Sequence, residues 1–172
     1  SLRKQRANGA AAQRMDLLEG VRLHLNLAVT ARRMYQQDCE EARGNKTSCS
    51  VLSWYYATKV KVPCFQYETQ QGYQAAIHDM DYNVFGIVDE GATTKRQTNV
   101  VYKEGRKTNA DVVISLVHFY LTELNTNAGH ADKLTLWMDS CSGQNRNQFI
   151  VQYLYTRVLH GLHKEIHVKY MV

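Results

Sequence analysis

The stretch from Leu134 to Asn147 constrains the fold of this chain more than any other. It begins with a short apolar run, Leu-Thr-Leu-Trp-Met, whose length and composition are typical of a buried strand. The run ends in one carboxylate, Asp139, where the strand leaves the core. The polar residues that follow include Ser142, which can cap a helix beginning at about Asn145. Sites in open α/β sheets form at the carboxyl ends of strands, but a lone Asp here also fits a simple turn or cap.

The composition indicates one globular domain. At 172 residues, 44% of them hydrophobic, the chain is long enough to bury a core. No apolar run approaches the roughly 20 residues of a membrane helix, so we expect no membrane association. The net charge of +5 is compatible with nucleic acid but does not single it out. Reduced thiols and an intracellular location are favoured because no C-x-x-C pair occurs among the four cysteines, Cys39, Cys49, Cys64 and Cys141.

Both ends of the chain indicate a piece of a longer protein. It has no initiating Met, and its last expected strand, residues 165–172, reaches the final residue without a turn or cap. We therefore divide it into an amino-terminal helix with a polar loop, residues 1–49, and a partial domain, residues 50–172, truncated at its carboxyl end.

Residues 10–37 predict one long helix with an apolar stripe formed by Leu18, Val21, Leu25, Ala28 and Tyr35, which Arg32 interrupts. The helix is basic through Arg14, Arg22, Arg32 and Arg33. Three interpretations remain open: packing of the stripe on the domain, contact of the arginines with nucleic-acid phosphates, and self-association through a short heptad seam. The polar residues 38–49 contain Gly44 and Asn45 and predict a loop.

From Ser50 onward the pattern alternates between strands and helices. Strands are expected at residues 51–57 with an extension to Pro63, and at 73–78, 82–88, 98–103, 134–138 and 165–172. Helices are expected at 109–125, capped by Thr108 or Asn109, and from about 145 to a left-handed glycine cap at His160-Gly161. The nearby His160, His163 and His167 are expected to be exposed and unliganded.

This order of elements predicts the sheet. Consecutive strands joined by short turns should be antiparallel, whereas strands separated by helices should be parallel through right-handed crossovers. The strand ending at Asp139 should therefore lie beside, and parallel to, the strand containing Tyr55. The expected fold is α/β, with a ribonuclease-H-like mixed sheet (an antiparallel meander plus parallel strands) preceded by a long helix.

The motif Met138-Asp-Ser-Cys-Ser-Gly-Gln-Asn-Arg-Asn147 resembles the Asp-Asn-Cys-x-Gly-Gln-Asn-Lys-Asn signature of a large eukaryotic group of transposon-derived proteins. Ser140 and Arg146 replace the Asn and Lys of that signature, and the residues that coincide are Asp139, Cys141, Gly143, Gln144, Asn145 and Asn147. Other segments after residue 50 are also similar to the group: Phe85-Gly-Ile, the helix from Asn109 to Tyr120, and Tyr153-Leu-Tyr-Thr-Arg-Val-Leu-His-Gly161.

The resemblance implies a ribonuclease-H-like DDE transposase or integrase core that acts on DNA in the nucleus. In such cores two divalent ions, Mg²⁺ or Mn²⁺, clamp the attacking and leaving oxygens of a phosphate. Asp139 would be a catalytic, metal-binding acid. The turn after it would line the site through Ser140, Cys141, Gly143, Gln144, Asn145 and Asn147.

The chain departs from this pattern at the other acids. The group's first strand usually carries Asp between aromatic residues, but Trp54-Tyr-Tyr-Ala57 has Tyr55 in that position. A phenol is a poor Mg²⁺ ligand at neutral pH because its pKa is near 10. The third acid should follow a Gly-His-Thr turn beyond Val172. Carboxylates that could substitute, although each also fits a turn or cap, are Asp79, Asp81, Asp89 and Asp111.

We therefore expect a partial transposase- or integrase-like core with an ancestral activity of metal-dependent DNA cleavage and strand transfer, inactive as this chain. One alternative is a domesticated, non-catalytic module that binds DNA or protein. Another is a small structural α/β module in which Asp139 is only a cap. The sequence contains neither a Gly-rich phosphate loop nor a Gly-x-Ser-x-Gly elbow.

Overall fold

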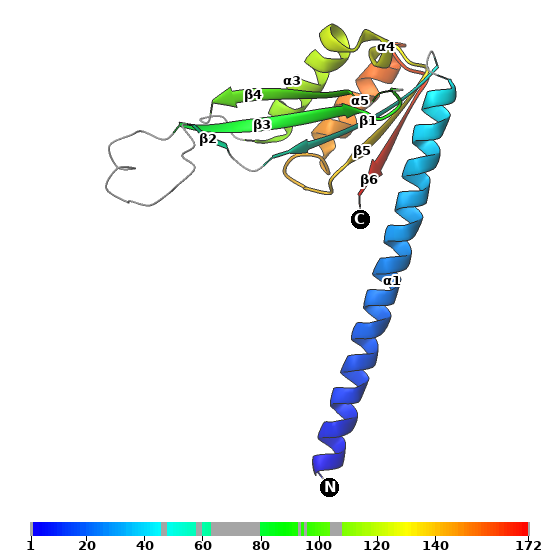
Figure 1. Ribbon diagram of the computed structural model, residues 1–172, viewed down its shortest axis with the longest axis vertical. Coiled ribbons are helices and arrows are strands. Elements are labelled where there is room, and N and C mark those ends of the chain that lie inside the picture. Colours follow the sequence, from blue (N-terminus) through cyan, green and yellow to red (C-terminus); the bar gives the residue numbers. More distant parts are fainter. Residues whose placement is uncertain are drawn as a thin grey trace. The chain divides into compact units, whose positions relative to one another are not determined.

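The computed structural model describes residues 2–45, 48–57, 60–62, 80–92, 94, 96–103 and 108–171. They fall into two units, the first running to Gln37 and the second covering Asp38–Met171. The elements in chain order are α1 (Leu2–Gly44), β1 (Cys49–Tyr56), β2 (Val60–Val62), β3 (Met80–Asp89), β4 (Arg96–Lys103), α3 (Ala110–Phe119), the π-helical turn η1 (Tyr120–Leu124), α4 (Thr126–Gly129), β5 (Lys133–Met138), α5 (Gln148–Leu159) and β6 (Glu165–Tyr170) (Figure 1).

Helix α1 confirms the predicted long helix and extends it at both ends. The predicted loop is wrong for residues 38–44, which remain helical up to Gly44. Tertiary contacts within the second unit explain this: Cys39 and Ala42 are buried, and the Asp38 carboxylate accepts hydrogen bonds from the Trp137 indole (2.8 Å) and the Lys169 ammonium (2.7 Å). The helix ends at Gly44, one of the two residues from which the loop was predicted.

Strand β3 is paired along both of its edges, which fixes the order of the sheet. Tyr82 pairs with Lys103 of β4 on one edge and with Val60 of β2 on the other. Since β4 covers the first edge as far as Asp89, β1 must share the second edge with β2. The order is therefore β4–β3–β1–β5–β6, with β2 extending β1 along β3.

The directions of the strands confirm the predicted mixed sheet. Strands β1 and β3 are antiparallel, as are β3 and β4, whereas β1 and β5, and β5 and β6, are parallel. The strand ending before Asp139 thus lies beside and parallel to the strand containing Tyr55, as expected. The strand predicted at 73–78 lies outside the described residues.

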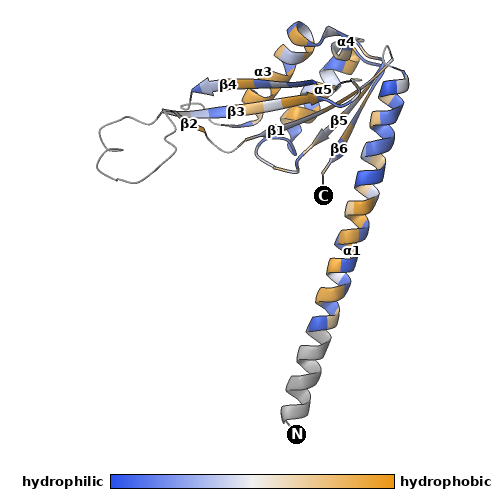
Figure 2. Ribbon diagram, viewed as in Figure 1, coloured by the Kyte–Doolittle hydropathy of each residue, from blue (hydrophilic) through white to orange (hydrophobic). Residues whose placement is uncertain are grey.

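Helices α3 and α5 and the turn η1 pack on one face of the sheet (Figure 1). The core cluster there includes Leu52, Trp54, Phe85, Val113, Leu121, Leu134, Leu136, Met138, Ile150 and Leu154. Strand β5 is buried along nearly its whole length, and Figure 2 shows the apolar character of the central strands. Thr135 and Trp137, which alternate with its core residues, face the other side of the sheet, where the indole of Trp137 meets Asp38.

The predicted helix at 109–125 is confirmed, with Asn109 as its cap: its side chain accepts from the Val112 N–H at 3.4 Å. Its last turn widens into η1, a departure that the periodicity does not predict. Asn125 then caps α4 by accepting from Ala128 N–H at 3.2 Å. A Cβ on Gly129 would collide with the Leu121 carbonyl oxygen, so only glycine fits this tight return of the chain.

No helix among the described residues is long and apolar enough to cross a membrane. Of the described cysteines, Cys39 is buried, Cys49 is half-buried and Cys141 is exposed, and Cys64 lies outside the described residues.

Candidate functional site

The turn after β5 is organised around one backbone carbonyl. The N–H groups of Gln144, Asn145 and Arg146 all donate to the Cys141 oxygen, at 3.2, 2.8 and 3.0 Å. This converging pattern keeps the chain turning for several residues after Asp139. A Cβ on Gly143 would meet nothing within 4 Å, so this glycine is not required by crowding.

Asp139 lies at the end of β5 with an exposed side chain. Its Oδ1 accepts two hydrogen bonds, one from the Cys141 N–H at 3.2 Å and one from the side-chain amide of Asn145. Within the described residues, both of the carboxylate's hydrogen bonds go to this oxygen. Asp139 is therefore a fixed carboxylate with one oxygen, Oδ2, left open.

Asn145 connects the turn to the centre of the sheet. The residue is only 2% exposed, and its Oδ1 accepts a hydrogen bond of 2.9 Å from the indole N–H of Trp54 on β1. Its Nδ2 donates to Asp139. Both halves of the amide are thus used, and β1 is linked to the Asp139 carboxylate through a single residue.

Asn147, not Ser142, caps the helix after the turn. Its Oδ1 accepts from the N–H groups of Phe149 and Ile150 at 3.1 and 3.2 Å, and α5 begins at Gln148. The predicted start at about Asn145 is wrong because the Cys141 carbonyl holds residues 144–146 in the turn. The predicted end is confirmed, with Gly161 at φ 69°.

Tyr55 occupies the position on β1 that lies next to Asp139. Trp54 is paired with Met138, so the next residues of the two parallel strands are Tyr55 and Asp139. The Tyr55 ring lies over Gly86, where a Cβ would stand 2.9 Å from its Cζ atom. Its hydroxyl accepts a 2.6 Å hydrogen bond from Gln97 Nε2. The neighbouring strand therefore presents a half-exposed phenol engaged with β3 and β4.

The substitute acids do not gather at this point. Asp89 is paired with Leu52, three residues before Tyr55 along β1, which corresponds to about 10 Å. Its carboxylate accepts from Asn125 Nδ2 at 3.0 Å instead. Asp79 and the side chain of Asp81 lie outside the described part of the chain.

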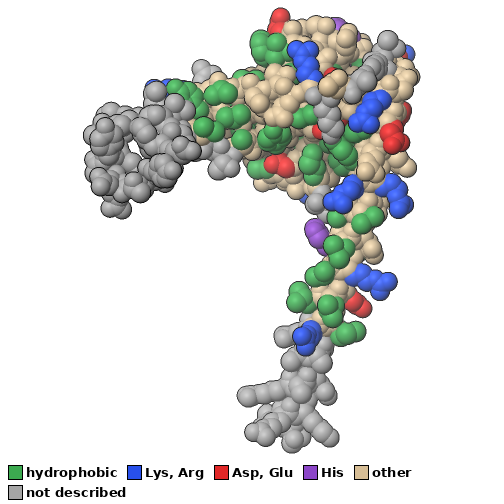
Figure 3. All heavy atoms as spheres, viewed as in Figure 1, with side chains coloured by type: hydrophobic (Ala, Val, Ile, Leu, Met, Phe, Trp, Pro, Cys, Tyr) green, Lys and Arg blue, Asp and Glu red, His purple; other side chains and the backbone are tan. Residues whose placement is uncertain are grey.

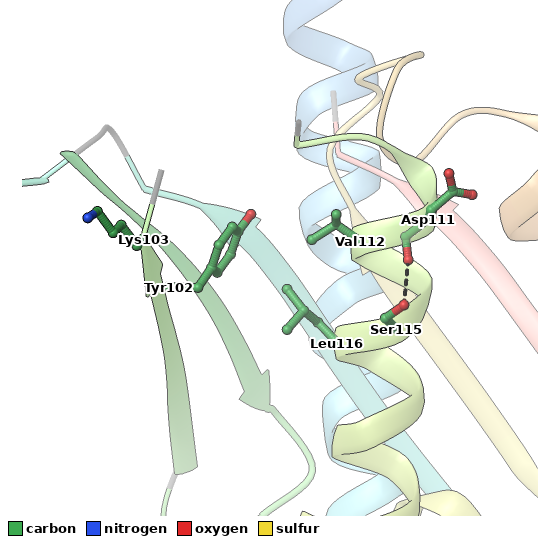
Figure 4. Close-up of a pocket in the computed structure, with 6 residues that line it drawn as sticks. All are labelled: Tyr102, Lys103, Asp111, Val112, Ser115 and Leu116. Atoms are coloured by element: carbon green, nitrogen blue, oxygen red, sulfur yellow. Dashed lines mark hydrogen bonds between the residues drawn. The ribbon is translucent and has the colours of Figure 1, made fainter. Parts of the chain in front are cut away.

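Asp111 belongs to the beginning of α3. It lines a cavity of about 490 Å³ between β4 and α3. Figure 4 shows its carboxylate turned away from Tyr102. The carboxylate accepts from Asn109 Nδ2 at 3.2 Å, so it serves the helix start. On the β4 side of the cavity, the Tyr102 hydroxyl donates to the Tyr56 hydroxyl at 3.1 Å, and burial raises the pKa of Tyr56.

These residues fit one weakly held, hydrated cation and do not fit a two-ion cluster. Among the described residues, no three His, Cys, Asp or Glu side chains are grouped so that they could hold a metal. Asp139 offers one open oxygen, and a single carboxylate leaves Mg²⁺ with most of its waters.

The predicted phosphate-contacting arginines belong to the first unit, whereas Asp139 belongs to the second. Arg14, Arg22, Arg32 and Arg33 are all exposed on α1. Figure 3 shows basic side chains spaced among hydrophobic ones along this helix.

Three roles were missed by reasoning from sequence. Trp54 is a hydrogen-bond donor to the motif as well as a core residue. His163, expected to be exposed, is buried: its Nε2 accepts from Arg157 Nε at 3.1 Å, so its Nδ1 carries the proton donated to the Ala131 carbonyl at 2.7 Å. Burial lowers the pKa of His163. The buried Arg157, which also donates to the Gly129 carbonyl, had no signal in the helical periodicity.

Comparisons with known proteins identify one family. A protein-family model described as "Domain of unknown function (DUF7869)" matches residues 73–172, more than half of the chain and a span that includes β3 to β6. No curated protein and no solved structure matches significantly. The chain belongs to the DUF7869 family, a domain of unknown function.

Proposed function

We propose that this chain is a partial ribonuclease-H-like core of the transposase or integrase type that does not cleave DNA by itself. The single observation that carries the proposal is the position of Asp139. It follows the interior strand β5 at its carboxyl end and lies beside the β1 position where the resembling group carries its first acid. Two neighbouring parallel strands that end together are where such cores gather their carboxylates.

The order of the strands supports the proposal independently of the motif. A ribonuclease-H-like sheet has an antiparallel meander of three strands. Two further parallel strands extend the sheet beyond the first strand of the meander. Here the meander is β1, β3 and β4, and the further strands are β5 and β6, each preceded by helical segments. Phe85-Gly-Ile, one of the segments that resemble the group, lies on β3.

The inactivity follows from the number of converging acids. Two-metal phosphoryl transfer requires several carboxylates around two ions about 3.5–4 Å apart. The described residues contribute Asp139, while Tyr55 brings a phenol to the adjacent position. Any Mg²⁺ or Mn²⁺ would be held weakly.

A cleavage and strand-transfer assay on plasmid and end-labelled duplex DNA, with Mg²⁺ and with Mn²⁺, tests the proposal. We expect no product from this chain. Cleavage that disappears in Asp139→Ala would show that another ligand completes the site and would overturn the proposed inactivity.

The alternative is a non-catalytic module that binds DNA, or a second chain, through α1. Exposure of its arginines favours contact with the phosphate backbone, for which a nuclear location is the corresponding expectation. Leu18, Val21 and Leu25 of the predicted apolar stripe are exposed on α1, which favours self-association through this stripe. Changing Leu18, Val21 and Leu25 together to Ser separates the two contributions. Sedimentation velocity of the protein alone should show that self-association is lost, and sedimentation with duplex DNA should show that binding through the arginines is retained.

A further inference from the structure

We infer that Asn145 is a positioning residue that fixes Oδ1 of Asp139 and leaves Oδ2 to bind a hard divalent cation, an inference that rests on the proposed function of Asp139. The three residues involved come from separate parts of the fold. Trp54 is in the middle of the sheet, Asn145 is in the turn, and Asp139 ends the strand next to that of Trp54.

The argument begins with the burial of Asn145. Burying an amide without partners is costly, and buried polar side chains therefore keep their hydrogen bonds. At 2% exposure, the Asn145 amide has two such bonds, to the Trp54 indole and to the Asp139 carboxylate. The indole can only donate, so it fixes which end of the amide faces β1, and the NH₂ end must then face Asp139.

The orientation of the amide determines which carboxylate oxygen is available. Asn145 Nδ2 and the Cys141 N–H both donate to Oδ1. A carboxylate oxygen that already accepts two hydrogen bonds is a weaker competitor for a cation than its free partner. Groups that orient a metal-binding side chain typically change metal affinity by about 10–100-fold when removed. Removing the Asn145 amide should therefore change the cation affinity by a measurable factor.

A merely structural role would make Asn145 a buried link that happens to touch Asp139. The two roles differ in whether removing the Asp139 carboxylate changes the hydrogen bond between Asn145 and the Trp54 indole. In the structural case, removing the exposed carboxylate leaves the buried amide and the Trp54 indole unchanged. In the positioning case, the amide loses its anchor and the indole hydrogen bond changes with it.

The first measurement uses the full chain without metal. Trp54 and Trp137 give the two indole N–H signals of the protein, and Trp137 donates to Asp38 instead. In ¹H–¹⁵N spectra, Asp139→Ala should shift the Trp54 signal and speed its exchange with solvent, while the Trp137 signal stays in place. Asp139 is exposed, so this variant keeps the core intact. An unchanged Trp54 signal would overturn the inference.

The second measurement adds Mn²⁺ in a Tyr55→Asp background, where a second carboxylate is present. Asn145→Ala should weaken Mn²⁺ binding by about 10–100-fold. Asn109→Ala is the matched control, since it removes a structural asparagine that caps α3 and leaves the affinity unchanged. Equal affinity with and without Asn145 would overturn the inference. If the Tyr55→Asp chain binds no Mn²⁺ at all, the proposed function fails, and the Trp54 signal alone decides whether Asn145 positions Asp139.

Discussion

Tyr55 and Asp139 are neighbours on two parallel strands, one residue beyond the Trp54–Met138 pair. Under the proposed function these are two positions that would carry acids, and one of them is a phenol. The Tyr55 ring is held over Gly86 and its hydroxyl accepts from Gln97, so the phenol is part of the ordered surface of β1, β3 and β4. The proposed inactivity depends on this phenol standing where a carboxylate would be needed.

Protonation of His163 should destabilise the fold. Burial, together with the charge of Arg157, lowers the pKa of His163 below 6.5, the value expected in the unfolded chain. The unfolded state therefore binds the proton more readily, so stability from this residue is full above about pH 6.5 and is lost as pH falls through the folded pKa. Urea unfolding between pH 7.5 and pH 5.5 should show this loss (pH limits of about one unit around 6.5).

His163→Gln should flatten that dependence, whereas the exposed His160→Gln should leave it as in the parent. A parent whose unfolding free energy does not change across the window would contradict the neutral, buried state of His163. If His160→Gln removes the pH dependence instead, the dependence comes from His160 and the prediction for His163 is wrong.

Gly129→Ala should destabilise the second unit by about 3 kcal/mol, at the upper end of overpacking costs. The new Cβ would strike the Leu121 carbonyl oxygen, and the Gly129 carbonyl would move away from Arg157. Thermal and urea unfolding measure the change. Gly143→Ala is the control, because a Cβ there meets open space and should change stability by no more than about 0.5 kcal/mol. Similar losses in both variants would contradict the close approach at Gly129.

Changing Arg14, Arg22, Arg32 and Arg33 together to Gln should weaken binding to duplex DNA regardless of its sequence. The slope of log affinity against log salt should fall by roughly 0.9 for each phosphate contact removed. Fluorescence anisotropy at several salt concentrations measures both effects. Binding that survives the four substitutions and high salt would place the DNA contact outside α1.

Local patterns predict most of the sheet, because strand spacing and the short connection between β3 and β4 leave few topologies. The neighbouring positions of Tyr55 and Asp139 follow from that order. The missed features depend on contacts between distant residues. Asp38 continues a helix because Trp137 and Lys169 reach it, and His163 is buried because Arg157 donates to it. The start of α5 was misplaced because Cys141 gathers three N–H groups ahead of the Asn147 cap.

Under the proposed function, Asp139 stands as a single carboxylate because its neighbour on β1 is Tyr55. Isothermal titration with Mn²⁺ of the parent, Tyr55→Asp and Val101→Asp tests this relationship. Val101→Asp adds the same charge at an exposed position on β4, three strand spacings or about 14 Å from β5. We predict tighter Mn²⁺ binding in Tyr55→Asp alone, lost again when Asp139→Ala is added. Equal affinity in the parent and Tyr55→Asp would contradict the claim.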